Sequence, residues 1–76
     1  MVAMTSEVVI DAQVQGGKPV LRGTRVTVDA VVRALAAGDD VATVARAYRL
    51  TDHQVRAALV YAADILGTER VVALPD

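Results

Sequence analysis

The chain has 76 residues and a formal net charge of −1, with 54% hydrophobic residues, 3% aromatic residues and no cysteine. The lack of cysteine excludes disulfides, thiol catalysis and cysteine–zinc sites, and the single histidine, His53, excludes a multi-histidine metal centre. So short a chain, rich in Ala and Val, buries little apolar area. We therefore expect one domain over residues 1–76 that gains stability as a homodimer.

The charges are unevenly distributed along the chain. Residues 18–56 hold seven Lys or Arg against four Asp, a net charge of +3, and both ends are acidic. A basic centre is compatible with nucleic acid binding. Residues 1–6 lack the features of a secretory signal, and the apolar run 57–63 is too short to span a membrane. We expect a cytoplasmic protein that does not bind membranes.

Residues 5–26 are predicted to form short strands and turns. The β-branched run Glu7–Ile10 is typical of a strand, and the polar stretch 11–17 contains a Gly-Gly pair that favours a turn. Residues 20–22 are extended, and Gly23 with Thr24 bends the chain. Thr27 either extends this strand or caps the helix that follows.

Three helices are predicted over residues 27–66. The first has one apolar stripe at helical spacing, and Gly38 ends it. That stripe contains Val28, Val31, Val32 and Leu35. On its outer face Asp29 and Arg33 form an i,i+4 pair.

The second and third predicted helices have clear start signals. Asp40 is a suitable N-cap for the second helix, whose apolar stripe contains Val41, Val44, Ala45 and Tyr48. Thr51 and Gln54 form a capping box for the third, with Leu50 and Val55 as its hydrophobic staple. We expect this helix to stop near Leu66, because Gly67 follows, and residues 67–76 to form a tail.

A helix-turn-helix is predicted over about residues 41–66. Only about three residues separate the two helices, and the small Ala45 lies where crossing helices approach most closely. Arg49 stands where the general pattern prefers glycine, so we expect a less tight turn. A plain three-helix bundle would produce the same periodicity, and that alternative stays open.

If the pattern binds DNA, the third helix enters the major groove with its N-terminal end first. His53, Gln54 and Arg56 would then face the base edges, while arginines elsewhere hold phosphates. Asp52 near this end argues mildly against DNA binding. The predicted DNA-binding residues are Arg22, Arg25, Arg46, Arg49, His53, Gln54 and Arg56.

The third helix is apolar on every side from Ala57 to Ala63. A helix with no polar face must be buried on all sides, which a monomer of this size cannot achieve. We therefore predict a twofold interface. Its predicted residues are Ala57, Val60, Tyr61 and Asp64.

Two motifs give the chain a family resemblance. The first is the run from Gly16 to Val26, and the second extends from Leu50 to Asp64. Together they resemble the domain-of-unknown-function family numbered 433 over about residues 5–66. The matching motif positions are Gly17, Pro19, Arg22, Gly23, Thr24, Arg25, Ala58, Tyr61 and Asp64. The resemblance implies a small helix-turn-helix antitoxin encoded beside a PIN-like nuclease toxin, with no agreed catalytic residues.

Enzymatic activity is not expected. Ser6 is the only serine, and the adjacent Asp39 and Asp40 do not form a clustered acid pair, because one of them is used as a helix cap. We predict no cofactor and no metal. The expected fold is α+β and mainly α, with short N-terminal strands before a three-helix bundle. The expected function is an operator-binding, toxin-neutralising antitoxin, and the alternative is a dimeric protein-interaction module that does not bind DNA.

Overall fold

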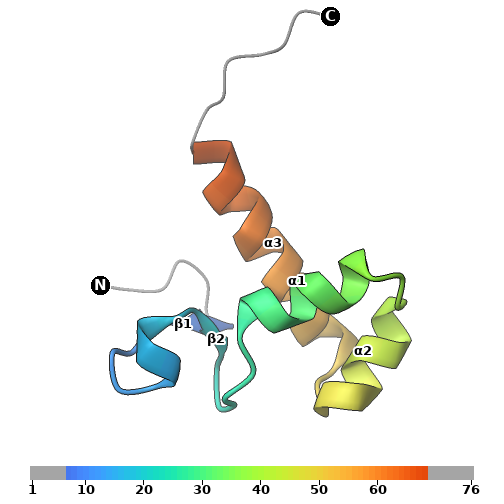
Figure 1. The fold of residues 1–76 in the computed structure, drawn as a ribbon, viewed down its shortest axis with the longest axis horizontal. Helices are drawn as coiled ribbons and strands as arrows, with labels where there is room; N and C mark the ends of the chain where they lie inside the picture. Colours follow the sequence, from blue (N-terminus) through green and yellow to red (C-terminus); the bar gives the residue numbers. More distant parts are fainter. Residues whose placement is uncertain (1–6, 69–76) are drawn as a thin grey trace, which may run out of the picture.

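The computed structural model describes residues 7–68. It contains β1 (Val8–Val9), the 3-10 helix η1 (Gln15–Gly17) and β2 (Val20–Leu21), followed by α1 (Val28–Ala36), α2 (Val41–Tyr48) and α3 (Asp52–Thr68). The predicted α+β, mainly α architecture is confirmed. Figure 1 shows the small hairpin on one side of α3, α2 on the other side, and α1 crossing α3.

The two strands form an antiparallel pair in which Val8 faces Leu21 and Val9 faces Val20. An isolated bridge between Val20 and Thr27 adds a third extended segment beside β2. Thr27 also accepts a hydrogen bond from the Ala30 N–H at 2.9 Å, which makes it the N-cap of α1. Thr27 thus serves both purposes that the sequence left open.

A tight turn connects β2 to this third segment. The Thr24 hydroxyl donates to the Leu21 carbonyl (2.8 Å), and the Val26 N–H donates to the Thr24 hydroxyl (2.9 Å). Gly23 has φ +80°, a left-handed conformation that glycine adopts without strain. The side chain of Thr24 therefore fixes the bend that the sequence predicted.

The core joins the strands to all three helices. Val8 and Leu21, both 0% exposed, cover the helices from the strand side. The other members of this buried cluster are Val28, Val31, Val44, Ala45, Leu50, Val55, Ala58 and Tyr61. Tyr48, predicted in the α2 stripe, is 37% exposed, so that stripe is shorter than expected.

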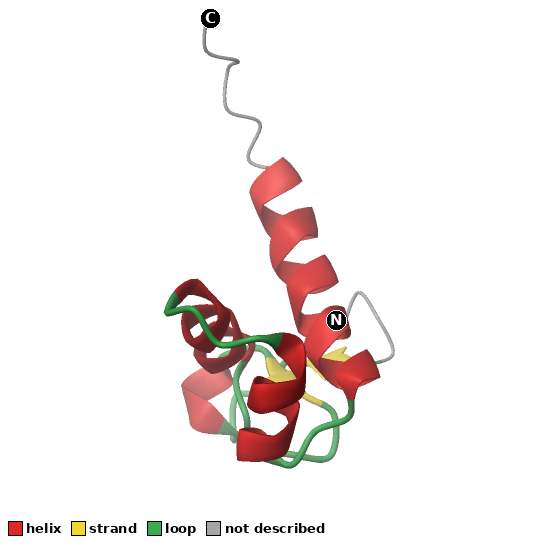
Figure 2. Cartoon of the chain, turned by 90° about the vertical axis from the view of Figure 1, so that its right-hand side faces the viewer, coloured by secondary structure: helices red, strands yellow, loops and turns green. Residues whose placement is uncertain are grey.

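The third helix is longer than predicted. It continues through Gly67 to Thr68 instead of stopping at Leu66. A glycine inside a helix costs only about 1 kcal/mol relative to alanine, so it weakens a helix without ending it. The second half of α3 extends beyond the other elements (Figures 1 and 2).

The Asp40 cap gives the fold a pH dependence. Hydrogen bonds from the Thr43 N–H (2.8 Å) and the Thr43 hydroxyl, with a smaller contribution from Arg46, hold the pKa of Asp40 below its ordinary 3.8. A carboxyl with a lowered pKa stabilises the fold above its ordinary pKa, and this stabilisation is lost as the pH falls through the lowered value. Asparagine can cap α2 without titrating.

We therefore expect the stability of Asp40→Asn to fall less than that of the wild type on acidification. Urea unfolding between about pH 6 and about pH 2 measures this difference. Asp39→Asn, which removes the adjacent carboxyl but keeps the Asp40 cap, is the control and should retain the acid sensitivity that the cap gives the wild type. Equal pH profiles for Asp40→Asn and the wild type would contradict this account.

Candidate nucleic-acid interface

The turn between α2 and α3 is closed by Arg49 in a left-handed conformation, φ 60° and ψ 45°. The Leu50 N–H donates to the Ala45 carbonyl (2.7 Å), and the Arg49 N–H donates to the Arg46 carbonyl (3.3 Å). This pair of bonds is the Schellman motif, which usually has glycine at the left-handed position. Burial of Leu50 and Ala45 supplies the apolar contact that accompanies the motif.

The expectation of a looser turn at Arg49 is therefore wrong. Arginine takes the backbone conformation that glycine would take, and α3 begins at Asp52, only three residues further on. An L-residue pays about 1–2 kcal/mol to adopt that conformation. The helix-turn-helix connection is therefore tight, and the conformational strain that it requires falls on the backbone of Arg49.

The N-terminus of α3 has the predicted capping box. The Thr51 N–H donates to Gln54 Oε1 (2.9 Å), and the Gln54 N–H donates to Thr51 Oγ1 (3.0 Å). Gln54 is half-buried, and its carbonyl oxygen is already used. Paired recognition of adenine by glutamine uses that oxygen, so Gln54 could face the bases only by sharing or releasing its cap.

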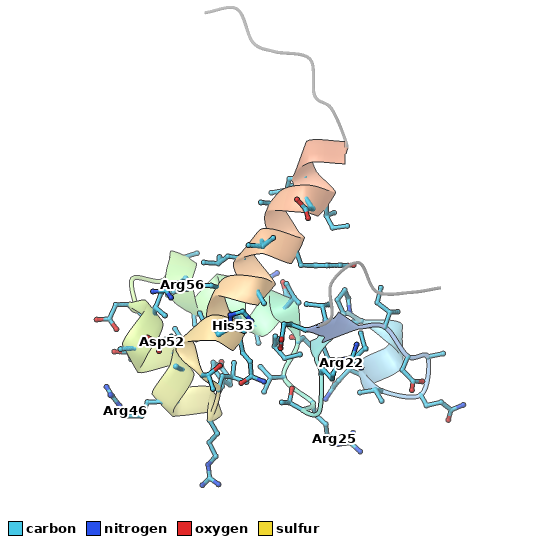
Figure 3. All side chains as sticks on the ribbon, turned by 180° about the vertical axis from the view of Figure 1, so that it is seen from behind. Arg22, Arg25, Arg46, Asp52, His53 and Arg56 are labelled. Atoms are coloured by element: carbon cyan, nitrogen blue, oxygen red, sulfur yellow. The ribbon has the colours of Figure 1, made fainter. Side chains whose placement is uncertain are left out.

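Four predicted residues surround the N-terminal end of α3. Arg46 and Arg49 come from α2 and the turn, and His53 and Arg56 come from the first turns of α3; all four are exposed. Figure 3 shows Arg46 and Arg56 on one side of His53, with Asp52 near them. The exposed Asp52 adds one negative charge to this surface, as the sequence indicated.

His53 lies beside an acidic residue of the hairpin. Its Nε2 is 3.5 Å from Glu7 Oε2, and the His53 side chain remains 76% exposed. A protonated His53 would form an ion pair there, so the Glu7 carboxylate competes with any anion that approaches the imidazole. This contact across the fold could not be read from local sequence patterns.

Arg22 and Arg25 lie on the opposite side of His53 from Arg46 and Arg56, on the turn that follows β2 (Figure 3). Both are exposed, and they flank the pair Gly23-Thr24. The fold thus separates the predicted DNA-binding residues into two groups, one at the start of α3 and one at the hairpin. Gln15 supports the hairpin group, since its amide donates to the Arg25 carbonyl at 3.3 Å.

The four predicted interface residues do not share one environment. Tyr61 is 7% exposed and belongs to the core of its own chain, so little of its side chain is left for the partner that the sequence predicted. Ala57 is half-buried, while Val60 (53% exposed) and Asp64 lie on the open surface. Tyr61 is buried in the same core cluster as residues of α1 and β1.

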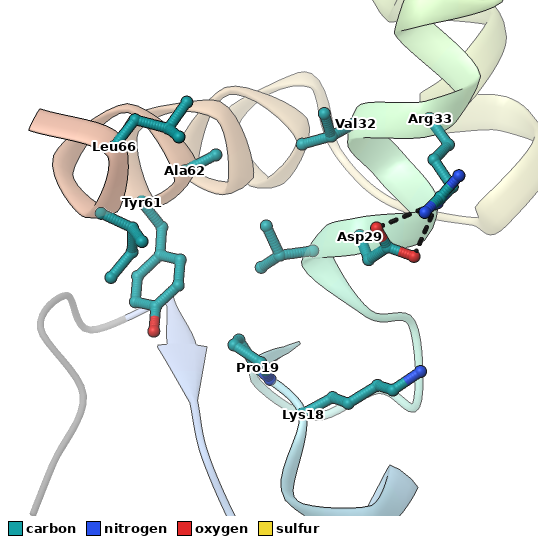
Figure 4. Close-up of a pocket in the computed structure, with 10 residues that line it drawn as sticks. Lys18, Pro19, Asp29, Val32, Arg33, Tyr61, Ala62 and Leu66 are labelled. Carbon is teal, nitrogen blue, oxygen red and sulfur yellow. Dashed lines mark hydrogen bonds and ion pairs between the residues drawn. The ribbon is translucent and has the colours of Figure 1, made fainter. Parts of the chain in front are cut away.

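An apolar groove that the sequence did not predict lies between α1 and the end of α3 (Figure 4). Its volume is about 560 Å³. Pro19, Val28 and Val32 line one side, and Ile65 and Leu66 stand exposed at 42% and 68% on the other. The apolar residues at the end of α3 were the only sequence signal for this groove. Its other wall depends on how α1 crosses α3, which local sequence patterns do not specify.

Within residues 7–68, no three His, Asp or Glu side chains gather as a metal site would require. In the same part of the chain, no helix is long and apolar enough to cross a bilayer. The described residues thus offer two surface features, a set of exposed arginines around the helix-turn-helix and an apolar groove between α1 and α3.

Together, the hairpin, the three helices and the tight connection at Arg49 define a small α+β protein of the helix-turn-helix type. The chain belongs to the family described as "Protein of unknown function (DUF433)", whose model matches residues 8–62. The predicted family is thereby confirmed.

One solved structure with the same fold is the crystal structure of Rv2018 from Mycobacterium tuberculosis. The two share 40% sequence identity with a TM-score of 0.63, over 68% of this chain and 24% of that chain. The match thus spans about a quarter of the length of Rv2018. No protein of curated function matches the sequence.

Proposed function

We propose that this chain is a DNA-binding antitoxin of a type II toxin–antitoxin pair. It binds its operator as a homodimer in the cytoplasm, represses its own operon and neutralises a PIN-like nuclease. The helix-turn-helix supports the DNA-binding part of this proposal, and the family resemblance supports the antitoxin part.

The observation that most supports DNA binding is Arg49. A strained arginine stands at a position where glycine would be free of strain. When a residue keeps a strained backbone conformation that glycine would adopt without strain, its side chain is a candidate for a functional role. Its guanidinium lies at the turn before α3, where a helix-turn-helix passes close to a phosphate strand.

The exposed cations fit two different roles. Arg46 and Arg49 precede α3 and are placed to hold phosphates, which fixes the position of the protein without reading sequence. Arg56 lies on the exposed face of α3 and can donate two hydrogen bonds to guanine. Gln54 is left out of this assignment because its oxygen caps α3. Arg22 and Arg25 form a second phosphate-binding group on the hairpin.

Band-shift experiments with DNA from upstream of the coding sequence separate these roles. We expect Arg56→Ala to lose about 1–3 kcal/mol of preference between the upstream DNA and an unrelated duplex. Arg46→Ala should weaken binding to both duplexes by the same factor, because phosphates carry no sequence. Equal loss on both duplexes in Arg56→Ala would contradict its role as a base reader.

Neutralisation of a nuclease is assigned to the C-terminal segment, residues 65–76. Ile65 and Leu66 begin it as exposed apolar side chains, and residues 69–76 lie outside the described part of the chain. Acidic and apolar residues in this segment suit a basic or metal-lined nuclease cleft. Co-purification with the product of the adjacent gene, lost when residues 69–76 are removed, is the expected result. Failure to co-purify would contradict the antitoxin part of the proposal. The DNA-binding part is tested separately, by the band-shift experiments.

The apolar groove favours a second candidate function. Exposed apolar patches and grooves often mark surfaces that bind another protein or a ligand, so a dimeric interaction module without DNA binding is the alternative. The two candidates differ at low salt. The antitoxin binds upstream DNA there, whereas the module leaves that DNA unshifted.

A further inference from the structure

The projecting half of α3, residues 59–67, has an apolar face that its own chain leaves open. Leu59, Val60 and Leu66 are 37%, 53% and 68% exposed, and Ala63 is exposed between them. Leu59, Ala63 and Leu66 follow the i, i+4, i+7 spacing that places residues on one face of a helix. Figures 1 and 2 both show this half extending beyond the other elements.

We propose that a second copy of this chain covers that face, with the two α3 helices antiparallel and the twofold axis at Ala63. This register places Val60 of one copy opposite Leu66 of the other and Leu59 opposite Gly67. Large side chains meet smaller ones, and the small Ala63 at the centre allows the helices to approach closely. The contact is self-complementary, as a twofold interface requires.

The charges of the helix favour this orientation. Between Arg56 and the end of α3 the only charged side chain is Asp64, which lies on the flank of the apolar face and stays in water. Antiparallel packing brings the positive end of each helix dipole toward the negative end of the other. Parallel packing would instead bring like ends together and place Arg56 beside Arg56 of the second copy.

The register also sets the spacing of the two N-terminal ends of α3, an inference that rests on the proposed function. His53 is ten residues from Ala63 in each copy, which at 1.5 Å per residue puts the two imidazoles about 30 Å apart along the helices. Successive major grooves on one side of a DNA duplex lie about 34 Å apart. The operator is therefore expected to contain two inverted half-sites about one helical turn apart.

The mass of the protein in solution, measured without DNA, tests whether two copies associate. We expect the full chain to show twice its 8.0 kDa mass by sedimentation. Ala63→Glu should shift it to a monomer of unchanged circular dichroism, because two carboxylates would meet at the axis. Ala47→Glu, at an exposed alanine of α2, should stay dimeric. A wild-type monomer at high concentration, or a dimer unaffected by Ala63→Glu, would overturn the proposal.

The lack of native cysteine allows a direct test of the register. Ala63→Cys should form a disulfide-linked dimer under mild oxidation, since the two residues 63 face each other across the axis. Val60→Cys should not link to itself, because its two copies are about 9 Å apart along the helices. Self-linking of Val60→Cys without that of Ala63→Cys would place the axis elsewhere and overturn this register. Neither sizing nor cross-linking uses DNA, so their failure is distinct from failure of the proposed function.

Discussion

Replacing Tyr61 with alanine is expected to lower the free energy of unfolding by about 3–5 kcal/mol, the range for losing a large buried aromatic side chain. Tyr61 is 7% exposed and packs in the core with residues of α1 and β1. A domain of this size has only about 5–15 kcal/mol of stability in total, so this loss threatens folding at ordinary temperature. Chemical unfolding at several protein concentrations measures it.

The matched control for Tyr61→Ala is the adjacent substitution Val60→Ala. Val60 is 53% exposed and makes no part of the core. We expect Val60→Ala to weaken self-association and to leave the stability of the single chain nearly unchanged. A Tyr61→Ala protein that dissociates into stable, fully folded monomers would show that Tyr61 is an interface residue after all.

Replacing Arg49 with glycine should change stability and DNA affinity in opposite directions. Glycine removes the cost of the left-handed backbone, so the free energy of unfolding should rise by about 1 kcal/mol. The same change removes one phosphate contact, which should lower the slope of log affinity against log salt by about 0.9. Thermal unfolding and a salt series of DNA titrations measure the two effects.

Two further variants separate the backbone effect at Arg49 from the charge effect. Arg49→Ala keeps a Cβ in the left-handed conformation, so it should lose DNA affinity without gaining stability. Arg33→Gln removes an arginine from α1, where Arg33 pairs with Asp29 at 2.9 Å, and should leave DNA affinity unchanged. If Arg49→Gly gains stability and keeps full affinity, the arginine has no role in DNA binding.

Local signals in the sequence predicted the helix starts correctly. Thr27, Asp40 and the Thr51–Gln54 pair each cap the helix expected of them, and Asp29 pairs with Arg33. These contacts join residues at most four positions apart, so the sequence contains all the information they need. The order of strands and helices followed from the same local reading, whereas the family was predicted from the resemblance of two motifs.

The features that the sequence did not predict depend on distant parts of the chain. Tyr61 is buried in the same core cluster as residues of α1 and β1, and the groove needs both α1 and α3. The contact of His53 with Glu7 joins the residue before β1 to the first turn of α3, which are far apart in the sequence. Arg49 differs from these cases, because the low preference of arginine for the left-handed conformation is overridden by the burial of Leu50 and Ala45, which holds the tight turn in place.

The most direct test of the central claim, that the unit formed by α2, its turn and α3 binds DNA, is a salt series of titrations. Fluorescently labelled upstream DNA is titrated with the full chain from about 50 mM to about 200 mM salt. We expect saturable binding whose log affinity falls linearly with log salt, with a smaller slope for Arg49→Ala than for the wild type. No saturable binding of a folded protein at about 50 mM salt, or an identical slope for the two proteins, would contradict the account.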